Sequence, residues 1–145
     1  MGIKELKYKD KINGLNNCPS TNCIEQNKEA YRFIKNEINQ KSFLPVGLEN
    51  PKRPFNKDSD KCKAYSGLSM FENEESAKKL YKELCKRNKR PVKTLKSLGN
   101  KLAKGHLMPI HGLCSPANST GHFTLYEYKD NNIESIFSII GELSC

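Results

Sequence analysis

The clearest apolar pattern along the chain lies in residues 77–85. Five residues stand at i, i+3, i+4, i+7 and i+8, the spacing of a helix that packs one face on a core: Ala77, Leu80, Tyr81, Leu84 and Cys85. Asn73 precedes them as a candidate N-cap, and Glu74 and Glu75 occupy the first turn, where the helix dipole favours acids. The pattern predicts a helix that starts after Asn73 and buries Cys85 in the core.

Short runs of aromatic and β-branched residues predict strands on both sides of this helix. They cover residues 30–34, 64–71, 101–110, 122–129 and 133–140. The last run also fits helical spacing, but its β-branched content and the turn residues at 130–132 favour a strand. After Pro91, residues 92–98 are expected to form a short second helix that stops at Gly99.

These elements predict an α+β fold. Residues 1–27 are polar and rich in asparagine, so they are expected to form an irregular lead-in to a single domain over residues 28–145. Three prolines and scattered charge indicate a long loop at residues 40–63, anchored by Phe43 and Leu44. The expected architecture is a roughly five-stranded, mostly antiparallel sheet with one or two helices packed on it.

The 145-residue length suits one domain, and the sequence contains no apolar run near the roughly 18–20 residues that cross a bilayer. The first fifteen residues lack the apolar segment of a secretory signal. We therefore expect a cytoplasmic protein with no membrane partner. In that setting the six cysteines are expected to be reduced thiols.

Charge is concentrated in one segment. The chain has 25 Lys and Arg against 16 Asp and Glu, and eleven of the basic residues lie within residues 78–104 with a single acid, Glu83. Such a segment attracts polyanions. The leading hypothesis is therefore a small basic bacterial binding protein whose cationic face engages nucleic acid or an acidic partner protein, through Lys82, Lys86, Arg87, Lys89, Arg90, Lys93 and Lys96. The alternative is a solvated surface, because most of these residues are lysines, which lack the bidentate fork of arginine.

Two other groupings contain residue types that carry chemistry. Cysteine and histidine residues at 18, 23, 106, 111 and 114 have spacings that fit a zinc site only loosely, so no metal is predicted. His122 ends the polar loop Ser119-Thr120-Gly121-His122, and a histidine at a strand start can act as a general acid or base. Ser115 is a candidate partner for it. The alternative is a turn histidine held by local hydrogen bonds.

A third grouping places Arg32 on the first strand, Gly67-Leu68-Ser69 on a strand that runs into the helix, and Glu127 or Glu134 on a late strand. In this order the chain resembles the ADP-ribosyltransferase-like fold, whose pattern is an Arg or His, then a Ser or Tyr, then a Glu. The resemblance implies that Arg32 and Ser69 bind NAD and that one of the two glutamates polarises the nicotinamide ribose. It therefore implies an alternative function, an NAD-using transferase or NAD hydrolase; without it no cofactor is expected.

The chain also resembles small uncharacterised bacterial proteins. They share Tyr-Arg, Phe-Leu-Pro, Gly-Leu-Ser-x-Phe and Gly-His-x-Thr in this order, and these segments begin here at Tyr31, Phe43, Gly67 and Gly121. This resemblance implies no function. The alternative for the third grouping is that Arg32 is a surface charge at a strand edge and Ser69 is an interior turn hydroxyl.

Overall fold

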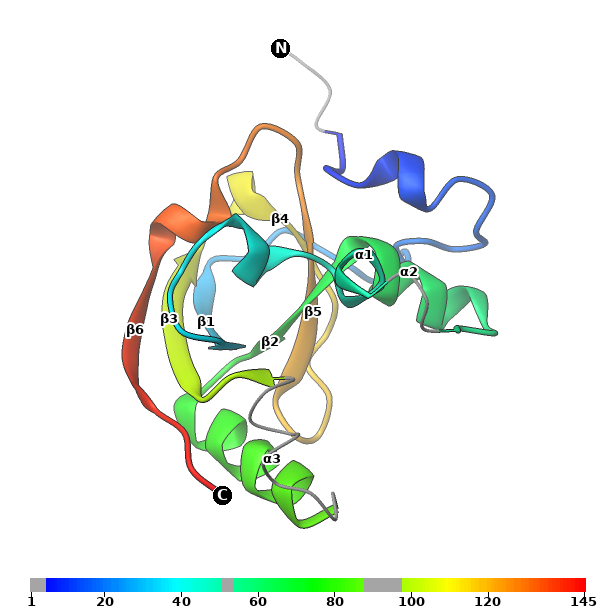
Figure 1. Cartoon of the computed structure of the whole chain (residues 1–145). Coiled ribbons are helices and arrows are strands. Elements are labelled where there is room, and N and C mark those ends of the chain that lie inside the picture. The colour runs from blue at the N-terminus through cyan, green and yellow to red at the C-terminus, as the bar shows by residue number, and fades with distance from the viewer. Residues whose placement is uncertain (1–4, 51–53, 88–97) are drawn as a thin grey trace.

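Six antiparallel strands form one curled sheet in the computed structural model, which describes residues 5–50, 54–87 and 98–145 (Figure 1). The strand order is β4-β5-β2-β1-β3-β6. The strands are β1 (Lys28–Ile34), β2 (Gly67–Phe71), β3 (Lys101–Leu107), β4 (Gly112–Cys114), β5 (His122–Glu127) and β6 (Phe137–Glu142). The predicted α+β fold with a mostly antiparallel sheet is confirmed, and β4 is the additional strand.

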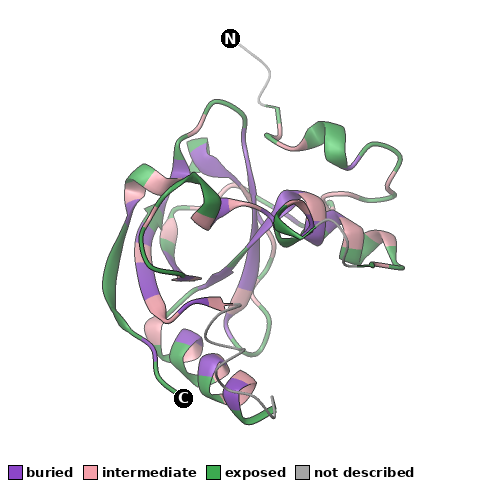
Figure 2. Ribbon diagram, viewed as in Figure 1, coloured by how far each residue is buried: buried purple, intermediate pink, exposed green. Residues whose placement is uncertain are grey.

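The predicted helix is α3 (Glu74–Arg87), and it packs on one face of the sheet. Its N-terminus is capped as expected, since the Asn73 side chain accepts a hydrogen bond from the Ser76 amide at 2.8 Å. The inward side of the helix packs against alternate residues of the strands, so the pattern at 77–85 is explained by burial (Figure 2). The members of this cluster include Ala77, Tyr81, Cys85, Tyr31, Phe71 and Leu102.

The other face of the sheet carries the larger apolar core. It is formed by the remaining alternate residues of the strands, among them Ala30, Ile34, Leu68, Met70, Phe123 and Leu125. A 3-10 helix, η2 (Gln40–Phe43), covers part of this face, and the Phe43 ring lies 5.0 Å from that of Phe137. The expected anchor at Phe43 is therefore buried.

The predicted loop at 40–63 is wrong in part, because it contains helices. After η2 come α1 (Val46–Glu49) and α2 (Asp58–Ser66). Pro45 stands at the N-cap of α1, where a proline does not interrupt a helix. Since α2 continues through residues 64–66, the strand predicted for 64–71 begins only at Gly67.

Two further boundaries differ in the C-terminal third. The strand predicted for 101–110 ends at Leu107, because Pro109 starts a 3-10 turn, η3 (Pro109–His111). The strand predicted for 133–140 is a 3-10 helix over its first half, η4 (Ile133–Ile136), and a strand from Phe137 onward. The run therefore contains both a helical turn and a strand, in that order. The helix predicted for 92–98 lies outside the described residues, apart from Leu98.

The N-terminal lead-in is fastened to the sheet at several points. The Lys7 amide donates to the Glu127 carbonyl at 2.8 Å, and Ile24 pairs with Cys114 of β4. A disulfide joins Cys18 to Cys62 of α2. The lead-in is therefore held against the β4–β5 side of the sheet. Among the helices that the described residues form, none has the length and apolar character needed to cross a bilayer.

The expectation of six reduced thiols is wrong for four of them. Besides the first disulfide, Cys85 of α3 is bonded to Cys145, and Cys23 and Cys114 are free and buried. Cys85 is thus both part of the core, as predicted, and a cross-link between the helix and the end of the chain. The partners are 44 and 60 residues apart in sequence, so only the fold brings them together.

Alkylation counts these bonds directly. Iodoacetamide added in denaturant without reductant should modify two cysteines, and prior reduction should raise the number to six. Modification of all six before reduction, read from the intact mass, would contradict the disulfides.

The Cys18→Ser variant should lose about 2–5 kcal/mol of stability, the usual contribution of a native disulfide, in urea unfolding.

Candidate functional site

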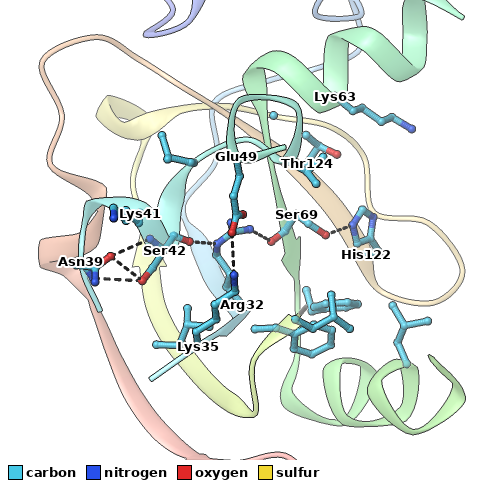
Figure 3. A pocket seen from close by; sticks show the side chains of 18 of the residues that line it. Arg32, Lys35, Asn39, Lys41, Ser42, Glu49, Lys63, Ser69, His122 and Thr124 are labelled. Atoms are coloured by element: carbon cyan, nitrogen blue, oxygen red, sulfur yellow. Dashed lines mark hydrogen bonds and ion pairs between the residues drawn. The ribbon is translucent and has the colours of Figure 1, made fainter. Parts of the chain in front are cut away.

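A split in the sheet creates the site. β1 pairs with β3 over seven residue pairs but with β2 at only one, Tyr31 with Phe71. Arg32, the next residue of β1, reaches across the place where β1 and β2 diverge. Its Nη1 donates to the Ser69 carbonyl at 2.8 Å and its Nε donates to the Ser42 carbonyl at 2.9 Å (Figure 3). The guanidinium therefore takes the place of strand-to-strand hydrogen bonds.

A pocket of about 650 Å³ opens at this split. Its walls come from β1, β2, β5, the segment at residues 35–49 and the inward edge of α3, which contributes Leu80 and Leu84. Gly67 lies in the lining, and a Cβ there would approach Thr124 Cγ2 to 2.5 Å. Glycine is thus required for β2 and β5 to lie together beneath the pocket.

His122 and Ser69 meet inside this pocket. Ser69 stands opposite Thr124 in the β2–β5 register, and His122 stands opposite Phe71, so the two side chains are diagonal neighbours on one face. The distance between Ser69 Oγ and His122 Nε2 is 2.5 Å. The prediction of Ser115 as the partner of His122 is wrong. The Ser115 hydroxyl instead accepts a hydrogen bond from the Thr124 amide at 2.9 Å.

Burial keeps His122 neutral at physiological pH. Desolvation lowers the pKa of its imidazole below the ordinary 6.5, and the charge of Lys63 lowers it further. The edge of the ring faces Phe71, with the two centroids 5.4 Å apart. A neutral imidazole hydrogen-bonded to a hydroxyl can accept a proton from it.

Arg32 carries a charge that is only partly compensated. Desolvation lowers its pKa from 12.5 to about 10, although the charge of Glu49 acts in the opposite direction. Glu49 itself is ion-paired with Lys35 at 3.0 Å. Among residues 5–50, 54–87 and 98–145, no carboxylate lies within ion-pair distance of the guanidinium. The lining as a whole is cationic, with four basic side chains and two acidic ones: Arg32, Lys35, Lys41, Lys63, Glu37 and Glu49.

The two glutamates implied by the family resemblance do not line this pocket. Glu127 stands at the other end of β5 from His122, is fully buried, and is ion-paired with Lys7 of the lead-in at 3.3 Å. Glu134 lies on η4. The fold therefore brings Arg32, Ser69 and His122 together and leaves Glu127 and Glu134 elsewhere.

The loosely spaced zinc ligands are also dispersed. Cys18 is consumed by its disulfide, and His106 hydrogen-bonds to Glu29 at 3.3 Å. Within the part of the chain that the structure describes, no group of three or more potential ligands is arranged to hold a metal ion. We identify no residues here that would bind one.

The structure describes three of the seven residues of the predicted cationic face. Of its seven residues, Lys82, Lys86 and Arg87 are exposed on α3, and Arg87 is 3.8 Å from Glu83. The other four, Lys89, Arg90, Lys93 and Lys96, lie outside the described residues. Leu80 and Leu84 of the same helix line the pocket, whereas Lys82 and Lys86 lie two positions further along and project about 200° away around the helix axis.

The four short segments that carry the resemblance to small bacterial proteins converge on this pocket. Arg32, Leu44, Ser69 and His122, one from each segment, all belong to its lining. The segments are far apart in sequence and meet only through the strand order. The chain matches no family model, no curated protein and no solved structure.

Glu127 should make stability depend on pH. Burial raises its pKa from 4.5 to about 7, in opposition to Lys7. Between these values the folded protein holds a proton that the unfolded chain has released, so the contribution of Glu127 to stability is largest below about pH 4.5 and is lost as pH rises through about 7. One pKa unit corresponds to about 1.4 kcal/mol.

Urea unfolding near pH 5 and near pH 8, inside and above this window, measures most of the effect. Glu127→Gln should flatten the fall in stability, because its side chain does not titrate, whereas the exposed Glu75→Gln should keep the wild-type dependence. An unchanged slope in Glu127→Gln would show that another group causes it.

Proposed function

We propose that this protein binds a phosphate-bearing ligand in the pocket between β1, β2 and β5. The observation that carries the proposal is the half-buried guanidinium of Arg32, which is held by two backbone carbonyls and has no carboxylate partner among the described residues. Burying a charge is costly unless an opposite charge compensates it. A bound anion would supply that compensation.

Phosphate suits this pocket better than a simple halide or carboxylate. Arginine has five N–H donors, and the two carbonyls use two of them, so three remain for the oxygens of a phosphate. Lys63 adds a donor nearby. The volume is in the range of small-molecule sites, roughly 300–1,000 Å³, and the apolar wall at Leu80 and Leu84 suits a base or another flat ring.

Among polymers that carry phosphate, we favour nucleic acid as the ligand. The exposed lysines of α3 would hold the backbone by charge, and the pocket would receive a terminal or splayed nucleotide. An acidic partner protein would use the same helix but leave the pocket empty. Leu80 and Leu84 in the pocket wall and the exposed Lys82 and Lys86 lie about 200° apart around the same helix, so a strand bound to both would pass around α3.

The NAD-using alternative shares Arg32 and Ser69, but the two glutamates that the resemblance implies are not in the pocket. Transfer at a nicotinamide ribose needs a negative group beside the developing oxocarbenium charge. Glu127 and Glu134 do not line the pocket, and of the two acids that do, Glu49 is ion-paired with Lys35. We therefore propose phosphate binding in preference to NAD chemistry. Because two disulfides persist best in oxidising surroundings, we also propose an oxidising compartment, in place of the cytoplasm expected from the sequence.

Calorimetry with pyrophosphate tests the pocket. Arg32→Lys keeps the positive charge but loses the planar fork, so its affinity should fall about 10- to 100-fold, the equivalent of one or two charged hydrogen bonds. The matched control is Arg87→Lys, the same change at an exposed position on α3, and it should bind like the wild type.

A second variant, Lys63→Gln, tests the pocket even if Arg32→Lys fails to fold. It leaves the hydrogen bonds of Arg32 to the Ser42 and Ser69 carbonyls in place. Its affinity for pyrophosphate should also fall. Equal binding by the wild type, Arg32→Lys and Lys63→Gln would contradict the proposed pocket.

Fluorescence anisotropy with short RNA and DNA tests the helix. The Lys82→Ser/Lys86→Ser variant should bind less tightly than Lys9→Ser/Lys11→Ser, which removes the same charge from the lead-in. On duplex DNA, the slope of log affinity against log salt should decrease by about 0.9 for each phosphate that the variant no longer neutralises. Equal affinities for the two double variants would make the helix an ordinary solvated surface.

A further inference from the structure

Ser69 has the surroundings of an activated nucleophile. A serine hydroxyl is weakly reactive unless a neighbouring base accepts its proton. His122 Nε2 lies 2.5 Å from Ser69 Oγ, and both side chains line the pocket. Ser69 is exposed although its strand neighbours Leu68 and Met70 are fully buried, so its hydroxyl is open to a ligand.

Arg32 contacts the backbone of the same residue. Its Nη1 is bonded to the carbonyl of Ser69 itself, so a phosphate on the remaining guanidinium N–H groups would lie close to the same residue (Figure 3). The nucleophile, its base and the anion-binding group thus form one run of contacts across β5, β2 and β1.

We propose that Ser69 accepts the phosphoryl group of a phosphate monoester bound to Arg32, with His122 as its general base. The inference deepens the proposed function and rests on it, since the phosphate that Arg32 holds is the group that reacts. The reaction class is phosphoryl transfer to serine followed by hydrolysis.

In the first step a bond forms between Ser69 Oγ and phosphorus, and the bond between phosphorus and the ester oxygen breaks. The serine proton passes to His122 Nε2 and then to the departing alcohol. In the second step water attacks the phosphoserine and gives its proton to His122. Serine leaves with that proton, inorganic phosphate is released, and the site returns to its starting state.

The charges in the pocket suit these two reaction steps. The desolvated imidazole of His122 is neutral before the reaction and can take the proton at neutral pH. The guanidinium of Arg32 can stabilise the charge on the phosphoryl oxygens in the transition state, because it is already fixed by its two carbonyl bonds. Lys63 supplies a second positive charge in the lining.

The experiment uses 4-nitrophenyl phosphate as substrate and diisopropyl fluorophosphate as a covalent probe. The wild type should release 4-nitrophenol, Ser69→Ala should release none, and His122→Gln should be at least about 100-fold slower, the usual contribution of a general base. Ser119→Ala, an exposed serine in the loop before β5, is the matched control and should keep the wild-type rate.

Diisopropyl fluorophosphate tests the reactivity of Ser69 in the wild-type protein alone. It carries no negative charge, so it should label Ser69 of the wild type independently of Arg32, and peptide mapping should find the label there. Pyrophosphate binding without turnover and without a label on Ser69 would overturn this inference while leaving the proposed pocket intact. Absence of pyrophosphate binding would overturn the proposed function and this inference together.

Discussion

The guanidinium of Arg32 holds together the two parts of the molecule that form the pocket. β1 and β2 share one residue pair, and beyond it Arg32 bridges them by bonding to a carbonyl of β2. The same side chain bonds to the Ser42 carbonyl and lies 5.5 Å from the centre of the Phe43 ring, so it also fixes η2 over the core. A single half-buried cation thus sets both the width of the split and the position of the segment that covers it.

This arrangement links ligand binding to reactivity. Figure 3 shows an almost linear series of contacts that runs from Ser42 through Arg32 and Ser69 to His122. A phosphate bound to Arg32 would compensate its charge. Since Arg32 is hydrogen-bonded to the Ser69 carbonyl, the phosphate would lie near the residue whose hydroxyl bonds to His122. Because desolvation lowers the pKa of both Arg32 and His122, the same burial that makes an anion favourable also leaves a neutral base beside it.

Local patterns in the sequence were sufficient for α3, β1 and β5, whose apolar spacing reflects burial on one or both faces. They were insufficient for α2, which has few apolar residues, and for the partner of His122. Ser115 is near His122 in sequence, but Ser69 is 53 residues away and meets it only through the β2–β5 register. The two disulfides could not be predicted for the same reason, since their partners are joined by packing and not by spacing.

Crystals soaked in tungstate, a heavy analogue of phosphate, would show through the anomalous signal of the metal whether an anion binds beside Arg32. We expect a peak inside the pocket, within hydrogen-bond distance of the Arg32 guanidinium and near Ser69, that disappears in Arg32→Lys crystals. Peaks confined to exposed lysines, with none beside Arg32, would contradict the proposed pocket.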